Sequence, residues 1–269
     1  MNKRLMFSAA LVMALLSANA QKRAFTIEDL YRVKGVSSVS LSPDGKTVCY
    51  TASSSDLKSQ KSGSDIYIMN ADGSHTKALT EDGKSSSAVW SKDGKSIFFT
   101  NNEKGTAQIF RMDLTTCETE QVTDYELGIG SPVISPDERY IAFTAEVYPD
   151  LGADAKANKA RMEKKEQGPV QAHIADKLLY RHWTSYNDGR CNHLILFDTQ
   201  TKTYKDLTPG NYSLIFVVGG GITYQFSPDS KEICFVSNHD EHQEASTNAD
   251  LWTVSVNGGE PVCITKENK

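Results

Sequence analysis

The sequence predicts an all-β protein of repeated four-stranded units, and two observations carry this prediction. A turn of the form Ser-x-Asp-x between two short apolar segments occurs four times, in residues 39–50, 88–99, 132–143 and 224–235. The serines of these turns stand at 42, 91, 135 and 227, so their spacings are 49, 44 and 92 residues. Two of these spacings fit a propeller blade of about 40 to 45 residues, which makes a β-propeller the expected fold.

Each unit is expected to contain the same four strands. In the first unit, residues 36–41 and 47–52 form a hairpin around the turn, residues 65–69 follow, and residues 76–80 close the unit with a threonine. Matching third and fourth strands follow each of the other turns. The propeller portion is therefore expected over residues 36–269, with blades at about 36–80, 86–123, 131–208 and 222–265.

The long third spacing is explained by an insertion at residues 147–190 within the third blade. Its first part, residues 154–167, is rich in helix-forming residues and nearly lacks an apolar face, which predicts a solvated helix or a mobile loop. Its second part, residues 178–189, concentrates aromatic and polar side chains in a loop-like segment. Long loops of that composition often carry function.

The start of the chain is typical of a secretory signal peptide. Residues 1–4 are basic, residues 5–16 are apolar, and residues 18–20 form a small-x-small cleavage site. A membrane anchor is the alternative, but an apolar run of about 12 residues is shorter than the roughly 20 that span a bilayer. We therefore expect residues 1–20 to be removed and the protein to be exported, periplasmic or extracellular, with no membrane association after cleavage.

Residues 21–35 are expected to form a lead-in to the first blade. Thr26 is a suitable N-cap for a short helix, because Asp29 stands three residues later and can return a hydrogen bond to the cap. Gly35 then ends the lead-in. This segment is too short to be a domain of its own.

Composition excludes several classes of function. The formal net charge is −5 and the basic residues are scattered, so the concentrated positive surface that nucleic acid requires is absent. Five cysteines give an odd count, and Cys49 and Cys234 both lie seven residues after the serine of their turn, as expected for small core residues. One disulfide bridge among the five is compatible with the sequence, whereas a disulfide framework is not expected.

Catalytic and metal-binding motifs are absent from the sequence. No Gly-x-Ser-x-Gly nucleophile turn occurs, and no Cys-x-x-Cys pair suggests zinc or redox chemistry. His239 and His242 lie three residues apart in a loop-like segment, which is better explained as a solvated loop than as a metal site. We therefore predict no catalytic residue, no metal site and no cofactor. The turn aspartates are interpreted as structural; they are Asp44, Asp93, Asp137 and Asp229.

Several strings together resemble the propeller of secreted serine peptidases of the prolyl oligopeptidase (S9) family, in particular its dipeptidyl-peptidase and acylaminoacyl-peptidase branch. The resemblance covers residues 25–269 and rests on the Phe25–Leu30 segment before the first turn, the repeated Ser-Pro-Asp turns, Tyr180–Trp183 before Asp188-Gly189, and residues 237–240 with 246–251. The turn alone is unspecific, since TolB-like propellers share it.

The resemblance implies a propeller of seven or eight blades, four of them in this chain, followed by a C-terminal α/β-hydrolase domain that holds a Ser-Asp-His triad. No residue of this chain matches the triad motifs, so the chain alone is expected to be inactive. The propeller is expected to gate access of short peptides to the hydrolase domain. Arg181, His182 and Trp183 are the candidate residues that face the substrate or that domain, because an arginine beside an aromatic surface suits peptide carboxylates and carbonyls.

Three alternatives stay open at this point. A free-standing TolB-like periplasmic propeller would bind proteins and need no hydrolase domain. A closed ring of four blades is compatible with the blade count. For Trp183, packing within the insertion is the alternative to a role in facing a ligand.

Overall fold

The structure is a computed structural model that describes residues 23–175, 178, 180–214 and 223–267. The expected signal peptide, residues 1–20, lies outside the described residues. The chain divides into two compact units, one of residues 1–35 with 53–63 and one of residues 36–52 with 64–269.

The smaller unit contains helix α2 (Ile27–Leu30), which is four residues long. The Asp29 carboxylate accepts a hydrogen bond from the Thr26 backbone N–H at 3.0 Å, which is the reciprocal bond expected of a capping box. The Arg23 guanidinium donates to both oxygens of Asp29 at 2.5 Å and holds the pKa of that carboxyl below its usual range. Beyond Leu30 only tight-turn bonds follow, and no residue of the helix is buried against another part of the chain, so packing does not support a longer helix.

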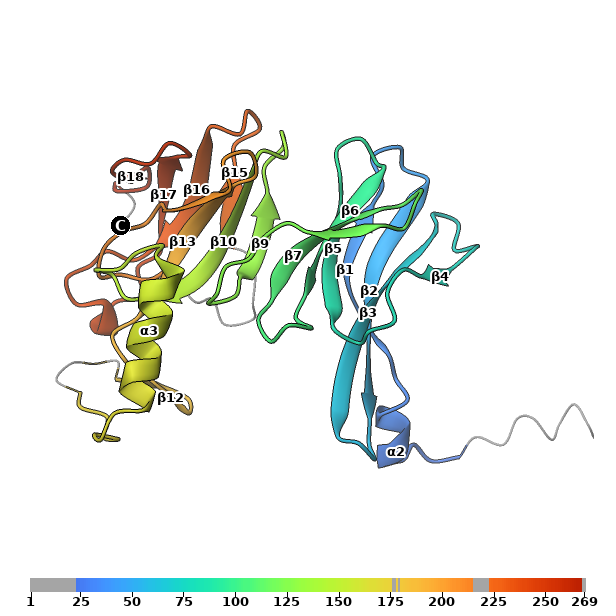
Figure 1. The fold of residues 1–269 in the computed structure, drawn as a ribbon, viewed down its shortest axis with the longest axis horizontal. Helices are drawn as coiled ribbons and strands as arrows, with labels where there is room; N and C mark the ends of the chain where they lie inside the picture. The colour runs from blue at the N-terminus through green and yellow to red at the C-terminus, as the bar shows by residue number, and fades with distance from the viewer. Residues whose placement is uncertain (1–22, 176–177, 179, 215–222, 268–269) are drawn as a thin grey trace, which may run out of the picture. The chain divides into compact units, whose positions relative to one another are not determined.

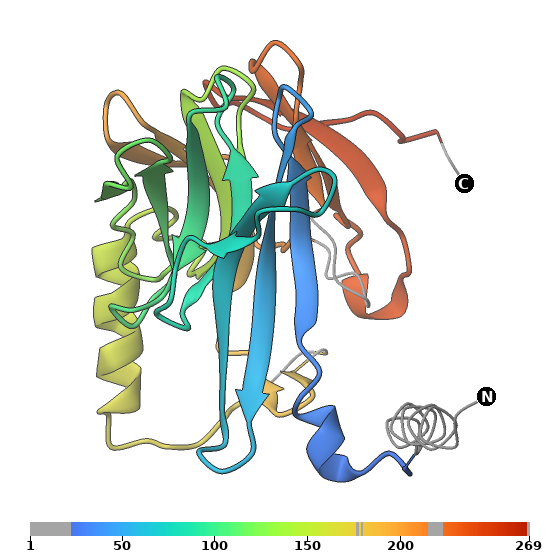
Figure 2. The same cartoon turned by 90° about the vertical axis from the view of Figure 1, so that its right-hand side faces the viewer.

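The larger unit carries the repeated sheets, apart from the ends of the first three strands at residues 35, 53–56 and 61–63. The described strands form four four-stranded sheets and one two-stranded hairpin (Figure 1), and the prediction of an all-β protein of four-stranded units is confirmed. We call the sheets blades 1 to 4 in chain order. Blade 1 consists of β1 (Gly35–Leu41), β2 (Thr47–Asp56), β3 (Lys61–Asn70) and β4 (Lys77–Ala78), whose neighbours in the sheet follow the chain (Figure 2).

The other blades repeat this order. Blade 2 consists of β5 (Ser85–Trp90), β6 (Ser96–Asn101), β7 (Gln108–Asp113) and β8 (Thr119–Gln121). Blade 3 consists of β9 (Gly130–Ile134), β10 (Tyr140–Val147), β13 (Cys191–Asp198) and β14 (Thr203–Asp206). Blade 4 consists of β15 (Tyr224–Phe226), β16 (Glu232–Ser237), β17 (Asp250–Ser255) and β18 (Val262–Cys263), with a short 3₁₀ helix η2 (Gln243–Ala245) before β17.

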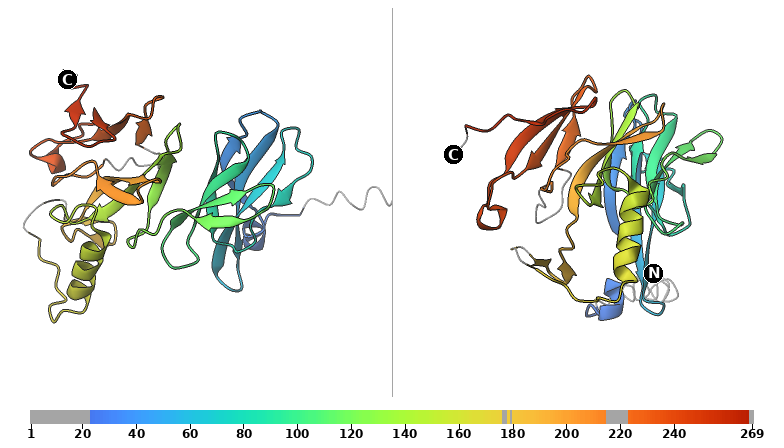
Figure 3. Two further views of the ribbon diagram at one scale, coloured as in Figure 1. Left: turned by 45° about the horizontal axis from the view of Figure 1, so that its top comes forward. Right: turned by 60° about the vertical axis from the view of Figure 1, so that its left-hand side comes forward.

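The insertion leaves blade 3 between β10 and β13. It contains helix α3 (Ala155–Glu166) and the hairpin of β11 (Arg181–His182) and β12 (Ser185–Tyr186), both visible in Figure 3. The sequence of residues 154–167 predicted either a solvated helix or a mobile loop, and the structure shows a helix there. Its N-cap is Asp154, whose side chain accepts the Ala157 N–H at 3.0 Å.

The Ser-x-Asp turns have one geometry in all four blades. Each serine hydroxyl donates to the aspartate two residues later, at 2.6 to 2.7 Å. The residue after the aspartate is left-handed, with φ of 73° at Gly45 and 60° at Glu138. These bonds confirm the structural interpretation of the turn aspartates.

A threonine closes each blade in the same way. The hydroxyl oxygens of these threonines accept a backbone N–H from the third strand of the same blade, at 2.9 to 3.0 Å. The pairs are Thr80 with Ile66, Thr123 with Ile109, Thr208 with Leu194 and Thr265 with Leu251. The closing threonine therefore fastens the outer edge of a blade to its third strand.

The core lies between blades and not within any one sheet. One cluster joins blades 1 and 2, a second joins blades 2 and 3, and a third joins blades 3 and 4. Trp90 packs on the first cluster while its indole N–H donates to the Ser40 carbonyl at 3.1 Å. Trp252 packs on the third cluster, as expected of a strand tryptophan. Each blade thus depends on its neighbour to bury its apolar face.

Candidate functional site

The β11–β12 hairpin places the three predicted site residues at one tip. The backbone of Arg181 pairs with Tyr186, and that of His182 pairs with Ser185. Trp183 occupies the turn with φ 50°, a left-handed conformation, and its side chain is 83% exposed. Arg181 is exposed as well. The structure therefore presents a cation and an indole on one short, solvent-facing hairpin.

The hairpin is held from one side by stacking. The rings of His173 and Tyr186 lie 4.0 Å apart and are nearly parallel, at 4°. The backbone N–H of Asn187 donates to the carbonyl of Tyr180 at 2.8 Å, which closes the base of the hairpin. These contacts limit the orientations that the tip can take.

Asp188 anchors the segment that leads from the hairpin back to blade 3. The Arg190 Nε donates to both of its carboxylate oxygens, at 3.0 and 2.9 Å, and the Lys165 ammonium donates to its backbone carbonyl at 2.8 Å. Arg190 also pairs with Glu146 of β10 at 3.1 Å. The hairpin is thereby tied to α3 and to the third blade. Sequence reasoning missed this role of Asp188, although Asp-Gly does signal a turn.

Asn158 of α3 fastens the start of the insertion. Its side chain is fully buried; the amide oxygen accepts the Tyr148 N–H at 2.7 Å and the amide nitrogen donates to the carbonyls of Gly152 and Asp154 at 3.0 and 2.8 Å. All three bonds join α3 to the chain leaving β10. A buried polar group of this kind is costly when its partners are removed.

Asn158→Ala is therefore expected to lower the free energy of unfolding by about 1–3 kcal/mol, because the Tyr148 N–H and two carbonyls lose their partner. Limited proteolysis should also cut within residues 150–190 faster than in the unsubstituted chain. The exposed Asn102→Ala is the matched control in urea unfolding. Equal midpoints for the two variants would contradict this role of Asn158.

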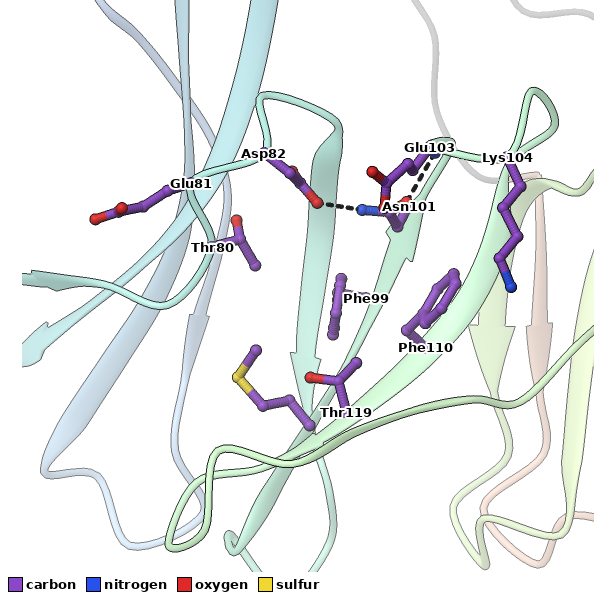
Figure 4. A pocket seen from close by; sticks show the side chains of 10 residues that line it. Thr80, Glu81, Asp82, Phe99, Asn101, Glu103, Lys104, Phe110 and Thr119 are labelled. Atoms are coloured by element: carbon purple, nitrogen blue, oxygen red, sulfur yellow. Dashed lines mark hydrogen bonds between the residues drawn. The ribbon is translucent and has the colours of Figure 1, made fainter.

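A pocket of about 270 Å³ lies between blades 1 and 2 (Figure 4). Phe99 and Phe110, on paired strands, present their rings to it, and Asp82 and Thr119 lie on opposite sides. Asn101 donates to the Asp82 carboxylate at 2.5 Å. No sequence motif pointed to this pocket.

Blade 3 holds a buried pair of His193 and Asp206. His193 is fully buried; its Nδ1 lies 2.7 Å from an Asp206 carboxylate oxygen and its Nε2 lies 2.9 Å from the Gly210 carbonyl oxygen. Burial opposes the charge, but hydrogen bonds to Asp206, Cys191 and Gly210 and the Asp206 charge outweigh it and raise the pKa of His193 to about 9. This pair serves the fold rather than the exposed hairpin.

A metal site is not found within the described residues. In them, no group of three or more histidine, cysteine or acidic side chains is arranged to hold a metal ion. All five cysteines are free, and burial raises the pKa of Cys49 to about 11, which makes that thiol unreactive. The helices of the described part are all too short or too polar to cross a bilayer.

Two protein families match the sequence. The TolB beta propeller domain matches residues 19–167, and the dipeptidyl peptidase IV N-terminal region matches residues 153–269. Dipeptidyl-peptidase 5 of Porphyromonas gingivalis is 29% identical over 231 residues, which is 83% of this chain and 33% of the relative. The chain spans about a third of the length of the curated relatives that it matches.

Solved structures share the fold. The acylaminoacyl peptidase of Pyrococcus horikoshii superimposes with a TM-score of 0.60 at 19% identity, over 87% of this chain and 32% of the other. The β-propeller domain of the Trilobed protease from Pyrococcus furiosus gives a TM-score of 0.50 at 16% identity, over 86% of this chain and 57% of the other. At these identities the likeness concerns the fold alone.

Proposed function

Because the chain belongs to the TolB β-propeller domain family and is related over most of its length to the N-terminal propellers of S9-family dipeptidyl peptidases, we propose that it is the substrate-gating propeller portion of an exported serine peptidase. Its substrates are short peptides, and bond cleavage takes place on a C-terminal α/β-hydrolase domain of the complete protein. The observation that carries the proposal is the match of residues 153–269 to the dipeptidyl peptidase IV N-terminal region.

The hairpin tip supplies the recognition chemistry of this proposal. A guanidinium donates paired hydrogen bonds to a peptide carboxylate or single bonds to carbonyls, and an indole covers an apolar side chain. Arg181 and Trp183 have the exposure that such contacts require. Their anchoring through Asp188 supports a fixed position, which costs less ordering entropy when a peptide binds.

Exposed apolar strand residues support the presence of further blades in the complete protein. More than half of the side-chain surface is exposed at two residues of β1, Val39 and Leu41. The same is true at the end of blade 4, for Val262 of β18 and Ile264 just after it. Within blades 1 to 4, equivalent faces are covered by the next blade. Additional blades would bury these side chains in the same way.

The complete protein that contains these residues is expected to release dipeptides from short peptides and to leave folded proteins intact. Arg181→Ala and Trp183→Ala are each expected to lower kcat/KM for a dipeptidyl substrate about tenfold or more, since one charge-assisted bond or one aromatic contact is worth about 1.5–3 kcal/mol. The readout is hydrolysis of dipeptidyl p-nitroanilides compared with hydrolysis of a folded globular protein. Lys164→Ala, on the neighbouring helix, is the matched control.

Two results would count against this proposal. Unchanged peptide kinetics in both variants would remove Arg181 and Trp183 from the substrate surface. Absence of any peptidase activity, together with capture of a cell-envelope protein by the purified protein, would favour the second candidate. That candidate is a free-standing TolB-like periplasmic propeller that binds proteins, and the match of residues 19–167 favours it.

A further inference from the structure

The spaces between successive blades can be compared because the blades share one register. Phe99 and Phe143 each stand eight residues after the serine of their turn. In blade 2 the backbone of Thr119 pairs with that of Met112, and in blade 3 the backbone of Tyr204 pairs with that of Phe197. Thr119 and Tyr204 therefore occupy equivalent positions in their sheets. The blade 1–2 pocket and the space between blades 2 and 3 are therefore structurally equivalent.

Two tyrosine rings fill the space between blades 2 and 3. Tyr125, two residues after the closing threonine of blade 2, is 1% exposed, and its ring centroid lies 4.8 Å from that of Tyr204 and 5.1 Å from that of Phe143. The Tyr204 hydroxyl accepts the Asp124 backbone N–H and donates to the Asp124 carboxylate, each at 3.0 Å. The fold is thus built to hold phenol rings at this level.

The blade 1–2 pocket lacks both rings. Asp82 stands two residues after the closing threonine of blade 1, where blade 2 has Tyr125. Thr119 stands in blade 2 at the position where blade 3 has Tyr204. What is left is a volume of about 270 Å³ beside the rings of Phe99 and Phe110, whose centroids are 5.9 Å apart. Glu81 corresponds to Asp124, and among the residues that the structure describes its backbone N–H has no acceptor.

We propose that the blade 1–2 pocket binds a hydroxyphenyl ring that a ligand supplies. The ring lies against Phe99 and Phe110, and its hydroxyl accepts the Glu81 N–H as the Tyr204 hydroxyl accepts that of Asp124. Three acidic residues, Glu81, Asp82 and Glu103, outnumber the one cation of the lining, Lys104, whose ammonium points to the Gln121 amide oxygen at 2.8 Å. A phenol that carries a cationic group is therefore the favoured class.

The site is independent of the proposed peptidase role, since it lies outside the insertion and its test requires no catalysis. The probe is tyramine, titrated into the chain and followed by ligand-observed NMR and by the shift in Tm. A saturable Kd on the order of 1 mM is expected, the affinity of one buried ring with one hydrogen bond. The anionic analogue 4-hydroxyphenylacetate is expected to bind at least tenfold more weakly.

Thr119→Tyr is expected to weaken tyramine binding at least tenfold and to raise Tm, because the new ring occupies the pocket as Tyr204 does in blade 3. Thr115→Tyr, an exposed change in the neighbouring turn, should leave binding unchanged, and Thr119→Phe is a second blocking variant should the first fail to fold. Equal binding of a blocked Lys-Tyr-Lys tripeptide, which carries the cationic groups that the lining favours, would assign the ring to a peptide side chain. Binding of tyramine alone would assign it to a free amine. Undiminished binding in both blocking variants, or no saturation by 10 mM tyramine (roughly ten times the expected Kd), would overturn the proposal.

Discussion

Replacing His193 with leucine is expected to destabilise the folded chain by about 3–5 kcal/mol, which is the cost of leaving one member of a buried ion pair without its partner. Asp206 would then lack its cationic partner. Its second oxygen still accepts the Thr208 N–H at 3.0 Å, but a single neutral donor does not replace a cation. The loss should appear as a lower urea midpoint with an unchanged slope.

From its two contacts we infer that His193 is an imidazolium in the folded state. Its Nε2 faces a carbonyl oxygen, which can only accept, so that nitrogen carries a proton. Its Nδ1 faces a carboxylate oxygen at 2.7 Å, where a second proton gives a charge-assisted bond. Both ring nitrogens are therefore donors, and the pair joins β13 to β14 and to the segment after the closing threonine.

The same pair predicts how stability depends on pH. The pKa of His193 rises from 6.5 to about 9 on folding, so the folded state holds its proton more tightly than the unfolded state. Its contribution is fully present below about pH 6.5 and is lost as the pH rises through about 9. The expected loss over that window is on the order of 3 kcal/mol.

The test compares unfolding free energies at pH 6 and pH 9.5 for the unsubstituted chain, His193→Leu and the double variant His193→Leu/Asp206→Leu. The unsubstituted chain should lose stability over this range, whereas His193→Leu should change less. The double variant should be more stable than His193→Leu, because it removes the unpaired carboxylate. His75→Leu, an exposed change, is the control. A single variant as stable as the double variant would show that no buried charge pair exists.

Residue His193 also illustrates what sequence could not reveal. The repeat predicted four strands per blade because turn chemistry is local: a serine, an aspartate and a left-handed position suffice to define the hairpin. His193 stands one residue before the third-strand residue that the closing threonine binds, and the other blades carry Asp65, Gln108 and Asp250 at that position. A histidine there looks like another polar strand residue until the fold brings Asp206 and Gly210 to its two nitrogens.

The candidate sites also differ in whether sequence alone could reveal them. Arg181 and Trp183 could be grouped from sequence because they are neighbours in one loop. The blade 1–2 pocket could not, since it depends on residues from two blades and on the absence of rings at Asp82 and Thr119. Detecting it requires the register between strands, which fixes which side chains share a level. Sequence does not distinguish helix α3 from a mobile loop for a related reason, because its buried residue is the polar Asn158, which gives no apolar signal.

The second large effect is expected at Tyr125, where Tyr125→Ala should cost about 3–5 kcal/mol, as for other buried aromatic side chains truncated in a core. The ring contacts Phe143 and Tyr204 between blades 2 and 3, and its hydroxyl donates to the Ala153 carbonyl at 3.2 Å. Tyr125→Phe removes only that bond and should cost about 1 kcal/mol. Tyr180→Ala, at an exposed position, is the control.

Tyr125→Ala would also give blades 2 and 3 a hollow like the one that blades 1 and 2 already have. Its urea midpoint should therefore rise when p-cresol is added, because a phenol ring can re-enter the vacated space and bind the folded state only. The control Tyr180→Ala should gain less, since its only expected site is the blade 1–2 pocket. A loss below about 1 kcal/mol in Tyr125→Ala would mean that the blades close over the missing ring. In that case, the open pocket beside Phe99 would owe its existence to local rigidity of blades 1 and 2 and not to the missing tyrosines.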